Sequence, residues 1–173
     1  MEDAYSTYRC AVSRLANQWL ADGLPPRQAL YEAADELDRL REQLGVGGMW
    51  DKAPSMVTST LDDGLGQGIA VIERFARTIG IRTVSLGLMQ SSEAIIDTCR
   101  RHQPTFLGLT ILQFDSEDDL SAIAKRLPQH TRIVAGGPVF EGDSDFASRT
   151  GTHFAAKNVA AFLRYMVDIA ITV

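Results

Sequence analysis

The sequence predicts an α/β fold, and three observations indicate it. From residue 55 onward, short apolar strand patterns alternate with glycine-containing turns and helical patterns. The strand patterns lack a clean polar–apolar alternation, which is typical of strands buried on both faces. The first 50 residues carry two amphipathic helical patterns instead. We therefore expect a five-stranded parallel Rossmann-like (flavodoxin-like) sheet with helices on both faces, preceded by an N-terminal helical hairpin.

Two domains are expected, a helical hairpin with its linker over residues 1–50 and an α/β domain over residues 51–173. In the hairpin, apolar residues recur every three or four positions. Gly23 ends the first helical pattern, Pro26 lies where proline is tolerated at the start of the second, and Gly45 is the expected stop. The glycine-rich stretch that follows is typical of a linker.

In the α/β part, caps and apolar runs predict the order of the elements. Ser91 or Ser92 is the expected N-cap of one helix, and Ser116 with Asp119 resembles a capping box at the start of the next. The final helix is expected from about Asn158. The strands are expected at residues 56–60, 81–86, 105–110, 132–135 and 152–154, and the other helices at residues 68–78, 92–101, 116–127 and, weakly, 140–148.

Composition excludes several classes of function. The formal net charge is −5 and the pI about 5.1, whereas nucleic acids and anionic membranes require a basic surface. Cys10 and Cys99 lie far apart and outside any metal-ligand spacing, which fits a reducing compartment. The sequence shows no leader pattern and no apolar run of membrane-spanning length, so we expect a cytoplasmic protein without a membrane or nucleic-acid partner.

Glycine gathers after the first and fourth expected strands, where an open α/β sheet binds its ligands. The spacing Gly64-x-Gly66-x-Gly68 is one residue short of a dinucleotide-binding fingerprint, and the phosphate-loop pattern GxxxxGK[ST] is absent. A phosphate-accepting receiver domain needs an aspartate at the end of the third strand, where Thr110 stands. The glycines therefore mark either tight turns or a backbone that a ligand approaches closely.

Three elements, in this order, resemble a known family. They are Asp63-x-Leu65-x-x-Gly68 after the first strand, residues 110–112 (Thr-Ile-Leu) after the third, and residues 136–138 (Gly-Gly-Pro) after the fourth. Cobalamin-binding domains of methionine synthase, corrinoid methyl carriers and cobalamin-dependent mutases carry D-x-H-x-x-G, S-x-L and G-G at these places. The resemblance implies a cobalamin (corrinoid) cofactor and matches the family except at the histidine and the serine.

The absent histidine changes what the resemblance implies. In the family, this histidine is the lower ligand of cobalt, and the aspartate hydrogen-bonds it. Leu65 cannot ligate a metal, and Asp63 either contacts a ligand or caps the following helix. Three states follow: cobalamin bound with an extended nucleotide tail and no protein ligand, cobalamin bound with its own base attached, or a site that has lost cobalamin.

The resemblance also implies the roles of individual residues. Thr110 would offer its hydroxyl to a benzimidazole nitrogen, or it belongs to ordinary strand packing. Gly136 and Gly137 would leave room for the ring, or they make a tight turn. His153 is expected beside the fifth strand at the ligand-facing end. The candidate cofactor-binding residues are Asp63, Gly64, Leu65, Gly68, Thr110, Leu112, Gly136, Gly137 and Pro138, with no metal ligand and no catalytic residue.

No pairing of a nucleophile with a base is evident, so we expect no catalysis by the chain alone. The resemblance implies a carrier or accessory subunit whose partner is a corrinoid-dependent methyltransferase or mutase. The alternatives are a sensor with a regulatory partner and an interaction module on a degenerate cobalamin-binding fold. About 45 residues precede the α/β part, enough for half of the usual four-helix cap, so the N-terminal helices are expected to pair in a homodimer or with a partner.

Overall fold

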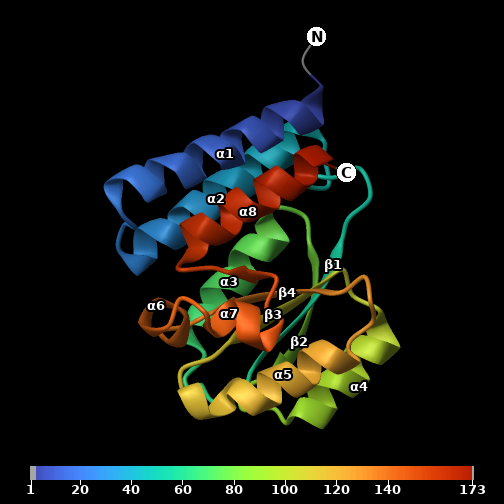
Figure 1. Ribbon diagram of the computed structural model, residues 1–173. Helices are drawn as coiled ribbons and strands as arrows, with labels where there is room; N and C mark the ends of the chain where they lie inside the picture. The colour runs from blue at the N-terminus through green and yellow to red at the C-terminus, as the bar shows by residue number, and fades with distance from the viewer. Residues whose placement is uncertain (1–2, 173) are drawn as a thin grey trace. The chain divides into compact units, whose positions relative to one another are not determined.

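A computed structural model describes residues 3–172 and contains a five-stranded sheet (Figure 1). The strand order is β2-β1-β3-β4-β5, and β1, β3, β4 and β5 pair in parallel. The expected α/β fold is confirmed, including the N-terminal helices. The strands are β1 (Ser55–Thr60), β2 (Arg82–Gly87), β3 (Phe106–Thr110), β4 (Arg132–Gly136) and β5 (Phe154–Ala155).

The helices match the expected positions with two corrections. The weak helix expected over residues 140–148 is two short helices, and the Ser116 side chain does not cap the helix it precedes. Ser91 does cap its helix, because its Oγ accepts from the Ala94 N–H at 3.2 Å. The helices are α1 (Ala4–Asp22), α2 (Arg27–Leu44), α3 (Gln67–Thr78), α4 (Ser92–His102), α5 (Glu117–Arg126), α6 (Val139–Gly142), α7 (Phe146–Thr150) and α8 (Val159–Thr172), with a 3-10 turn η1 (Phe114–Ser116).

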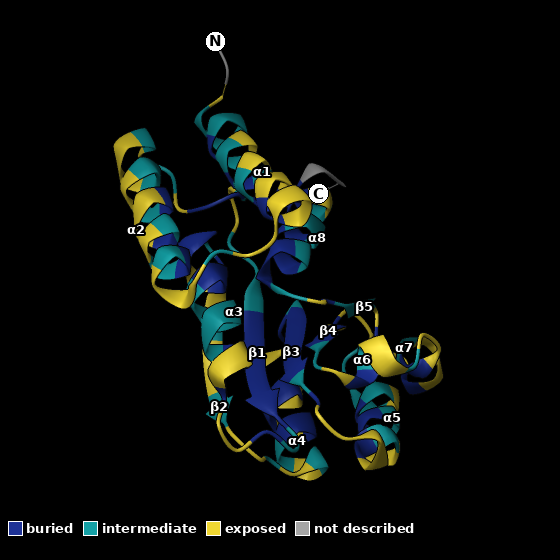
Figure 2. Ribbon diagram, turned by 90° about the vertical axis from the view of Figure 1, so that its left-hand side faces the viewer, coloured by how far each residue is buried: buried dark blue, intermediate teal, exposed yellow. Residues whose placement is uncertain are grey.

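The chain divides into two compact units. The α/β unit comprises residues 55–71 and 83–157, and the helical unit comprises residues 3–54, 72–82 and 158–172, so α3 begins in one and ends in the other. In the α/β unit, β1 and β3 are buried along most of their length (Figure 2). Because successive strand residues point to opposite faces, this burial shows that both faces of the central strands are covered.

One face of the sheet packs on α4 and α5. The two helices also contact each other, since Ser92 Oγ donates to Asp119 Oδ1 at 2.8 Å and Glu93 pairs with Arg126. An apolar core fills the space between these helices and the middle of the sheet. Its buried members include Val57, Ile95, Ile96, Leu107, Leu109, Ile111, Leu120, Ile123 and Ile133.

The helical unit contains α1, α2, the second half of α3, and α8. Tyr8 is fully buried and its hydroxyl donates to the Thr78 carbonyl at 2.8 Å, while Arg74 pairs with Asp35 and Asp38 of α2. Burial raises the pKa of Tyr8 well above its usual value, which keeps the phenol protonated as a donor. Within residues 3–172, none of the helices combines the length and the apolar character that a membrane crossing requires.

Candidate functional site

The carboxyl ends of β1 and β3 meet where the strand order reverses. Thr60 and Thr110 lie opposite each other at the ends of these strands. With β2 on one side of the pair and β4 on the other, the chain leaves β1 and β3 in opposite directions, and ligands of open α/β sheets bind at such a switch point. We name the segments that follow the strands loop 1 (residues 61–66, after β1), loop 2 (residues 88–91, after β2) and loop 3 (residues 111–116, after β3).

The Asp62 carboxylate joins loop 1 to loop 3. Its Oδ1 accepts from the Leu112 N–H at 2.7 Å, and its Oδ2 accepts from the Gln113 N–H at 2.9 Å and the Ser116 hydroxyl at 2.8 Å. This explains why Ser116 does not cap α5. One charged side chain, contributed about 50 residues away in the sequence, thus fixes the backbone of loop 3 with charge-assisted hydrogen bonds.

Asp63 is buried and holds loop 1 in its turn. Its Oδ1 accepts from the N–H groups of Leu65 and Gly66 at 2.9 and 3.1 Å, just before α3 begins. The Asp63 carbonyl accepts from the Thr60 hydroxyl at 2.6 Å. These contacts support the structural role for Asp63, and its contact with a cofactor stays a prediction.

The glycines of loop 1 make room for the side chains of loop 2. A Cβ at Gly66, whose φ is +67°, would lie 2.6 Å from a methyl of Leu88. A Cβ at Gly64 would lie 3.2 Å from the sulfur of Met89. Gly68, in the first turn of α3, faces open space instead. Two of the three glycines are therefore explained by contacts within the chain, and Gly68 stays accessible to a ligand.

Exposed apolar side chains gather on these three loops. Eight large apolar side chains are exposed in the described part of the chain, and five of them lie in loops 1 to 3. Exposed apolar side chains that gather on neighbouring loops are typical of a site for a ligand or partner. We call the five side chains the apolar rim: Leu65 (82% exposed), Met89 (64%), Phe114 (52%), Leu88 and Leu112 (39% each).

The remaining predicted residues lie at the ends of β3 and β4. Thr110 is half-buried, and its hydroxyl has no hydrogen-bond partner among residues 3–172, which leaves it available to a ligand. At Gly137, φ is +128° and a Cβ would come 1.9 Å from the Ile111 carbonyl oxygen, while the Gly136 carbonyl accepts from the Ile111 N–H at 2.9 Å. These glycines serve close backbone packing; their contact with a cofactor, like that of Pro138 at the start of α6, stays a prediction.

The three histidines lie at the amino-terminal edge of the sheet. His102 ends α4, His130 precedes β4, and His153 lies beside Ile133 near the start of β4. The expectation that His153 lies at the ligand-facing end was wrong. β5 begins at Phe154, one residue after His153, and Phe154 pairs with Val134 in the middle of β4. His153 therefore precedes β5 at its amino-terminal end. Its Nδ1 accepts from the Ile133 N–H at 3.0 Å, so the ring belongs to the scaffold.

The pKa of His153 is lowered, chiefly by burial and secondarily by Arg132. The folded chain therefore favours the neutral ring. Above the unfolded pKa of about 6.5 the ring is neutral in both states, and its full contribution to the free energy of unfolding is present. As the pH falls below this value the unfolded chain takes up the proton more readily, so this contribution is lost. Between about pH 6.5 and pH 5, we expect the free energy of unfolding of His153→Asn to fall less steeply than that of the unmodified protein. The asparagine oxygen can still accept from the Ile133 N–H, but it does not take up a proton in this range. Urea unfolding of both proteins across this range tests the expectation, and equal slopes would contradict it.

Neither cysteine lies in loops 1 to 3. Burial raises the pKa of the Cys99 thiol to about 12, so it stays protonated in the core, and Cys10 is exposed on α1. Among the described residues, no three or more His, Cys, Asp or Glu side chains form a group that could hold a metal ion.

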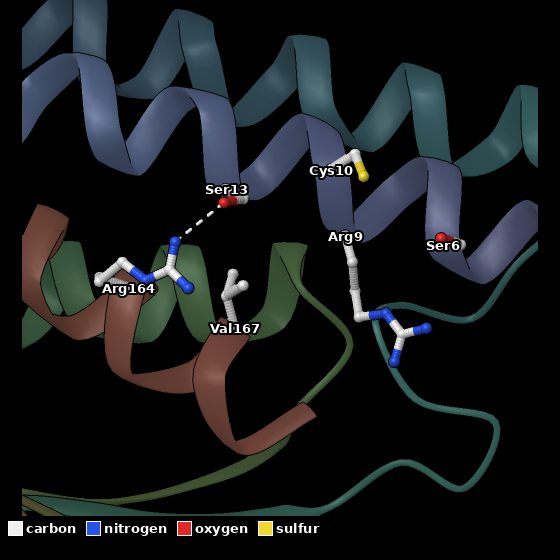
Figure 3. A pocket seen from close by; sticks show the side chains of 6 residues that line it. All are labelled: Ser6, Arg9, Cys10, Ser13, Arg164 and Val167. Atoms are coloured by element: carbon white, nitrogen blue, oxygen red, sulfur yellow. Dashed lines mark hydrogen bonds between the residues drawn. The ribbon is translucent and has the colours of Figure 1, made fainter. Parts of the chain in front are cut away.

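A hollow of about 360 Å³ lies in the helical unit and is lined by residues of α1 and α8 (Figure 3). Arg164 donates to Ser13 there and pairs with Asp168, and Arg9 donates to the Ala170 carbonyl at 3.0 Å. Both guanidinium groups thus connect α1 and α8 and have a structural role. The other lining residues are Ser6, Cys10 and Val167.

The structure adds four residues to the predicted set. Asp62, Leu88, Met89 and Phe114 were not among the residues that the sequence analysis singled out. The apolar pair in the loop after β2 was a usable signal, because large apolar residues are unusual in a polar strand-to-helix turn. The partners of Asp62 carry no local signal, since they lie in a distant loop.

The solved structures similar to this chain include the following three. A cobalamin-binding protein from Desulfitobacterium hafniense DCB-2 matches with a TM-score of 0.77 at 16% identity, over 94% of this chain and 79% of that one. The methanol:cobalamin methyltransferase complex of Methanosarcina barkeri matches with a TM-score of 0.65 at 17% identity, over 99% and 69%. The monomethylamine corrinoid protein of the same organism matches with a TM-score of 0.58 at 16% identity, over 97% and 99%.

The TM-scores show that the chain has the fold of solved cobalamin-binding proteins, as its motifs implied, and at these low identities they show the fold alone. No protein-family model matches the sequence. No curated protein sequence matches it either.

Proposed function

We propose that the chain is a corrinoid-binding protein, a carrier or accessory subunit that holds cobalamin at the carboxyl edge of its sheet without a histidine ligand to cobalt. The observation that carries the proposal is the apolar rim, on the loops that follow β1, β2 and β3 in a fold shared with cobalamin-binding proteins. Several large apolar side chains exposed on neighbouring loops are typical of a site that a ligand or partner covers.

The residues at this edge fit a corrinoid. The macrocycle presents a broad, largely apolar face, which the five side chains of the apolar rim can cover. Leu65, on loop 1, would contact the lower face of the ring. Thr110 keeps a free hydroxyl at the end of β3, suited to donate to a nitrogen of the nucleotide base. Gly68 leaves open space beside these groups.

The donor set agrees with binding that involves no imidazole. Leu65 occupies the place of the family's histidine, and all three histidines of the chain lie at the opposite edge of the sheet. Asp63, which would otherwise orient that imidazole, is engaged with the loop 1 backbone. Asp63 therefore has a structural partner of its own, and the leucine at position 65 leaves no imidazole that Asp63 would have to orient.

When bound, the corrinoid would supply alkyl-transfer or redox chemistry, and the chain would position it for a partner. Loops 1 and 3 would hold the ring, with Asp62 keeping the two loops in register. One similar structure is a methyltransferase complex. A corrinoid-dependent methyltransferase is therefore the first partner class to test, with a mutase as the second.

The experiment compares two leucines that are equally exposed. Leu112, on loop 3, and Leu24, between α1 and α2, are each 39% exposed. We expect Leu112→Ser to weaken retention of hydroxocobalamin by about tenfold, corresponding to ~1.4 kcal/mol of lost apolar contact, and Leu24→Ser to leave it unchanged. Absorption of the gel-filtered protein at increasing hydroxocobalamin concentrations gives the apparent affinity.

Equal affinities in Leu112→Ser and Leu24→Ser would place the corrinoid elsewhere on the chain. If the unmodified protein retains no corrinoid, the apolar rim belongs to the alternative function, a sensor or interaction module that binds another ligand or a protein. The carrier proposal would then be abandoned.

A further inference from the structure

Met89 in loop 2 has a strained backbone. Its φ is +50°, a left-handed conformation that bulky side chains rarely adopt and that costs roughly 1 kcal/mol or more. Among residues 3–172, Gln103 is the other non-glycine residue with positive φ, and it caps the end of α4, where this conformation is common. Met89 follows a strand and caps no helix, so the strain needs another explanation.

The surroundings hold Met89 in this conformation. Its N–H donates to the Thr60 hydroxyl at 2.8 Å, and the Gln90 N–H donates to the Thr60 carbonyl at 2.9 Å. The same Thr60 hydroxyl donates to the Asp63 carbonyl. The last residue of β1, which is fully buried, therefore fixes loop 2 against loop 1. Strain maintained in this way is typical of functional positions.

The side chain of Met89 contributes little to the fold. It is 64% exposed, and its sulfur lies against Gly64, one residue before Leu65. A glycine at position 89 would adopt the same backbone without strain. Contacts within the fold therefore do not explain a methionine at this position, and its sulfur lies on loop 1 beside Leu65, the residue that replaces the family's histidine.

A thioether is a soft donor that serves as an axial ligand to macrocycle-bound metals, as methionine does in cytochromes c. No other sulfur or imidazole donor occurs in loops 1 to 3. The histidines lie at the opposite edge, Cys99 is in the core and Cys10 is on α1. Met49, Met56 and Met166 are buried.

We propose that Met89 supplies the thioether that coordinates the metal of the bound corrinoid, in place of the family's imidazole. The inference rests on the proposed function, because it concerns the same site. A lone pair of the Met89 sulfur forms the bond, the donor that previously held that axial position leaves with its own electron pair, and no oxidation state changes.

The test uses the full chain with Met89→Leu, which keeps the bulk and removes the donor, and Met89→Gly, which removes donor and strain. Hydroxocobalamin is the probe, and the electron paramagnetic resonance of its reduced Co(II) form reports the axial donor. Leu65→His serves as the reference, because an imidazole on the same loop would add nitrogen superhyperfine splitting.

We expect Met89→Leu to keep the corrinoid with about tenfold weaker affinity and altered cobalt g-values and hyperfine splitting. Met89→Gly should show the same spectral change, while its apoprotein melts within about 2 °C of the unmodified protein or higher, since release of strain offsets the added chain entropy. A purely structural methionine would instead lower the melting temperature.

An unmodified protein and a Met89→Leu variant with identical cobalt spectra would overturn the Met89 proposal and leave the corrinoid proposal intact. If the unmodified protein retains no hydroxocobalamin, both proposals fail together. The two failures are therefore distinguishable.

Discussion

Asp62→Asn is expected to lose at least tenfold in affinity for hydroxocobalamin and about 2 kcal/mol in the free energy of unfolding. The carboxylate accepts from two backbone N–H groups and one hydroxyl of loop 3. An amide can accept only through its oxygen, and its NH₂ would face one of these donors. Loop 3 would then lose the position in which Leu112 and Phe114 are exposed beside loop 1.

Asp115→Asn is the matched control. Asp115 is exposed on loop 3 itself, so the substitution removes the same charge without a hydrogen bond to the backbone. We expect its affinity and its unfolding midpoint to equal those of the unmodified protein. Equal losses of affinity in Asp62→Asn and Asp115→Asn would show that negative charge at these loops determines binding, rather than the hydrogen bonds between Asp62 and loop 3. Titration by visible absorption and urea unfolding give the two readings.

Gly137→Ala is expected to destabilise the fold by about 4 kcal/mol, because strain and displacement add at this position. Its φ of +128° is unfavourable for alanine, and the new Cβ would meet the Ile111 carbonyl oxygen. The Ile111 carbonyl belongs to the backbone, so it cannot move aside as the end of a flexible side chain could. The expected result is a large fall in the urea midpoint or failure to accumulate as folded protein.

Gly68→Ala provides the contrast for Gly137→Ala. Gly68 lies in the first turn of α3, and a Cβ there would meet nothing within 4 Å. We expect the apoprotein to be about 0.5–1 kcal/mol more stable, as for glycine-to-alanine changes within helices. A comparable loss of stability in both variants would contradict the account of the two glycines.

Much of the fold was predictable from the sequence because the signals are local. Apolar runs predicted the strands of the sheet, Ser91 predicted a cap, and Gly45 predicted a helix end. Each depends on neighbouring residues. The division of residues 140–148 into two short helices was missed, since the helical pattern there is weak and each helix is shorter than two turns.

The candidate site was predictable in place but only partly in its contacts. Topology brings Asp63, Leu65 and Leu112 to one edge, as expected from the order of the strands. Ser116 instead donates to Asp62, a partner that no local pattern indicates. The edge on which His153 lies depends on the register of a two-residue strand, and the conformation of Met89 depends on contacts from another loop.

The most direct test of corrinoid binding is a titration of the unmodified protein with hydroxocobalamin, followed by gel filtration and visible absorption. The account predicts stoichiometric retention with the spectrum of a corrinoid whose own base is detached, because Thr110 and the loops around it would hold the nucleotide tail. Elution of the protein free of hydroxocobalamin, methylcobalamin and adenosylcobalamin alike would contradict it.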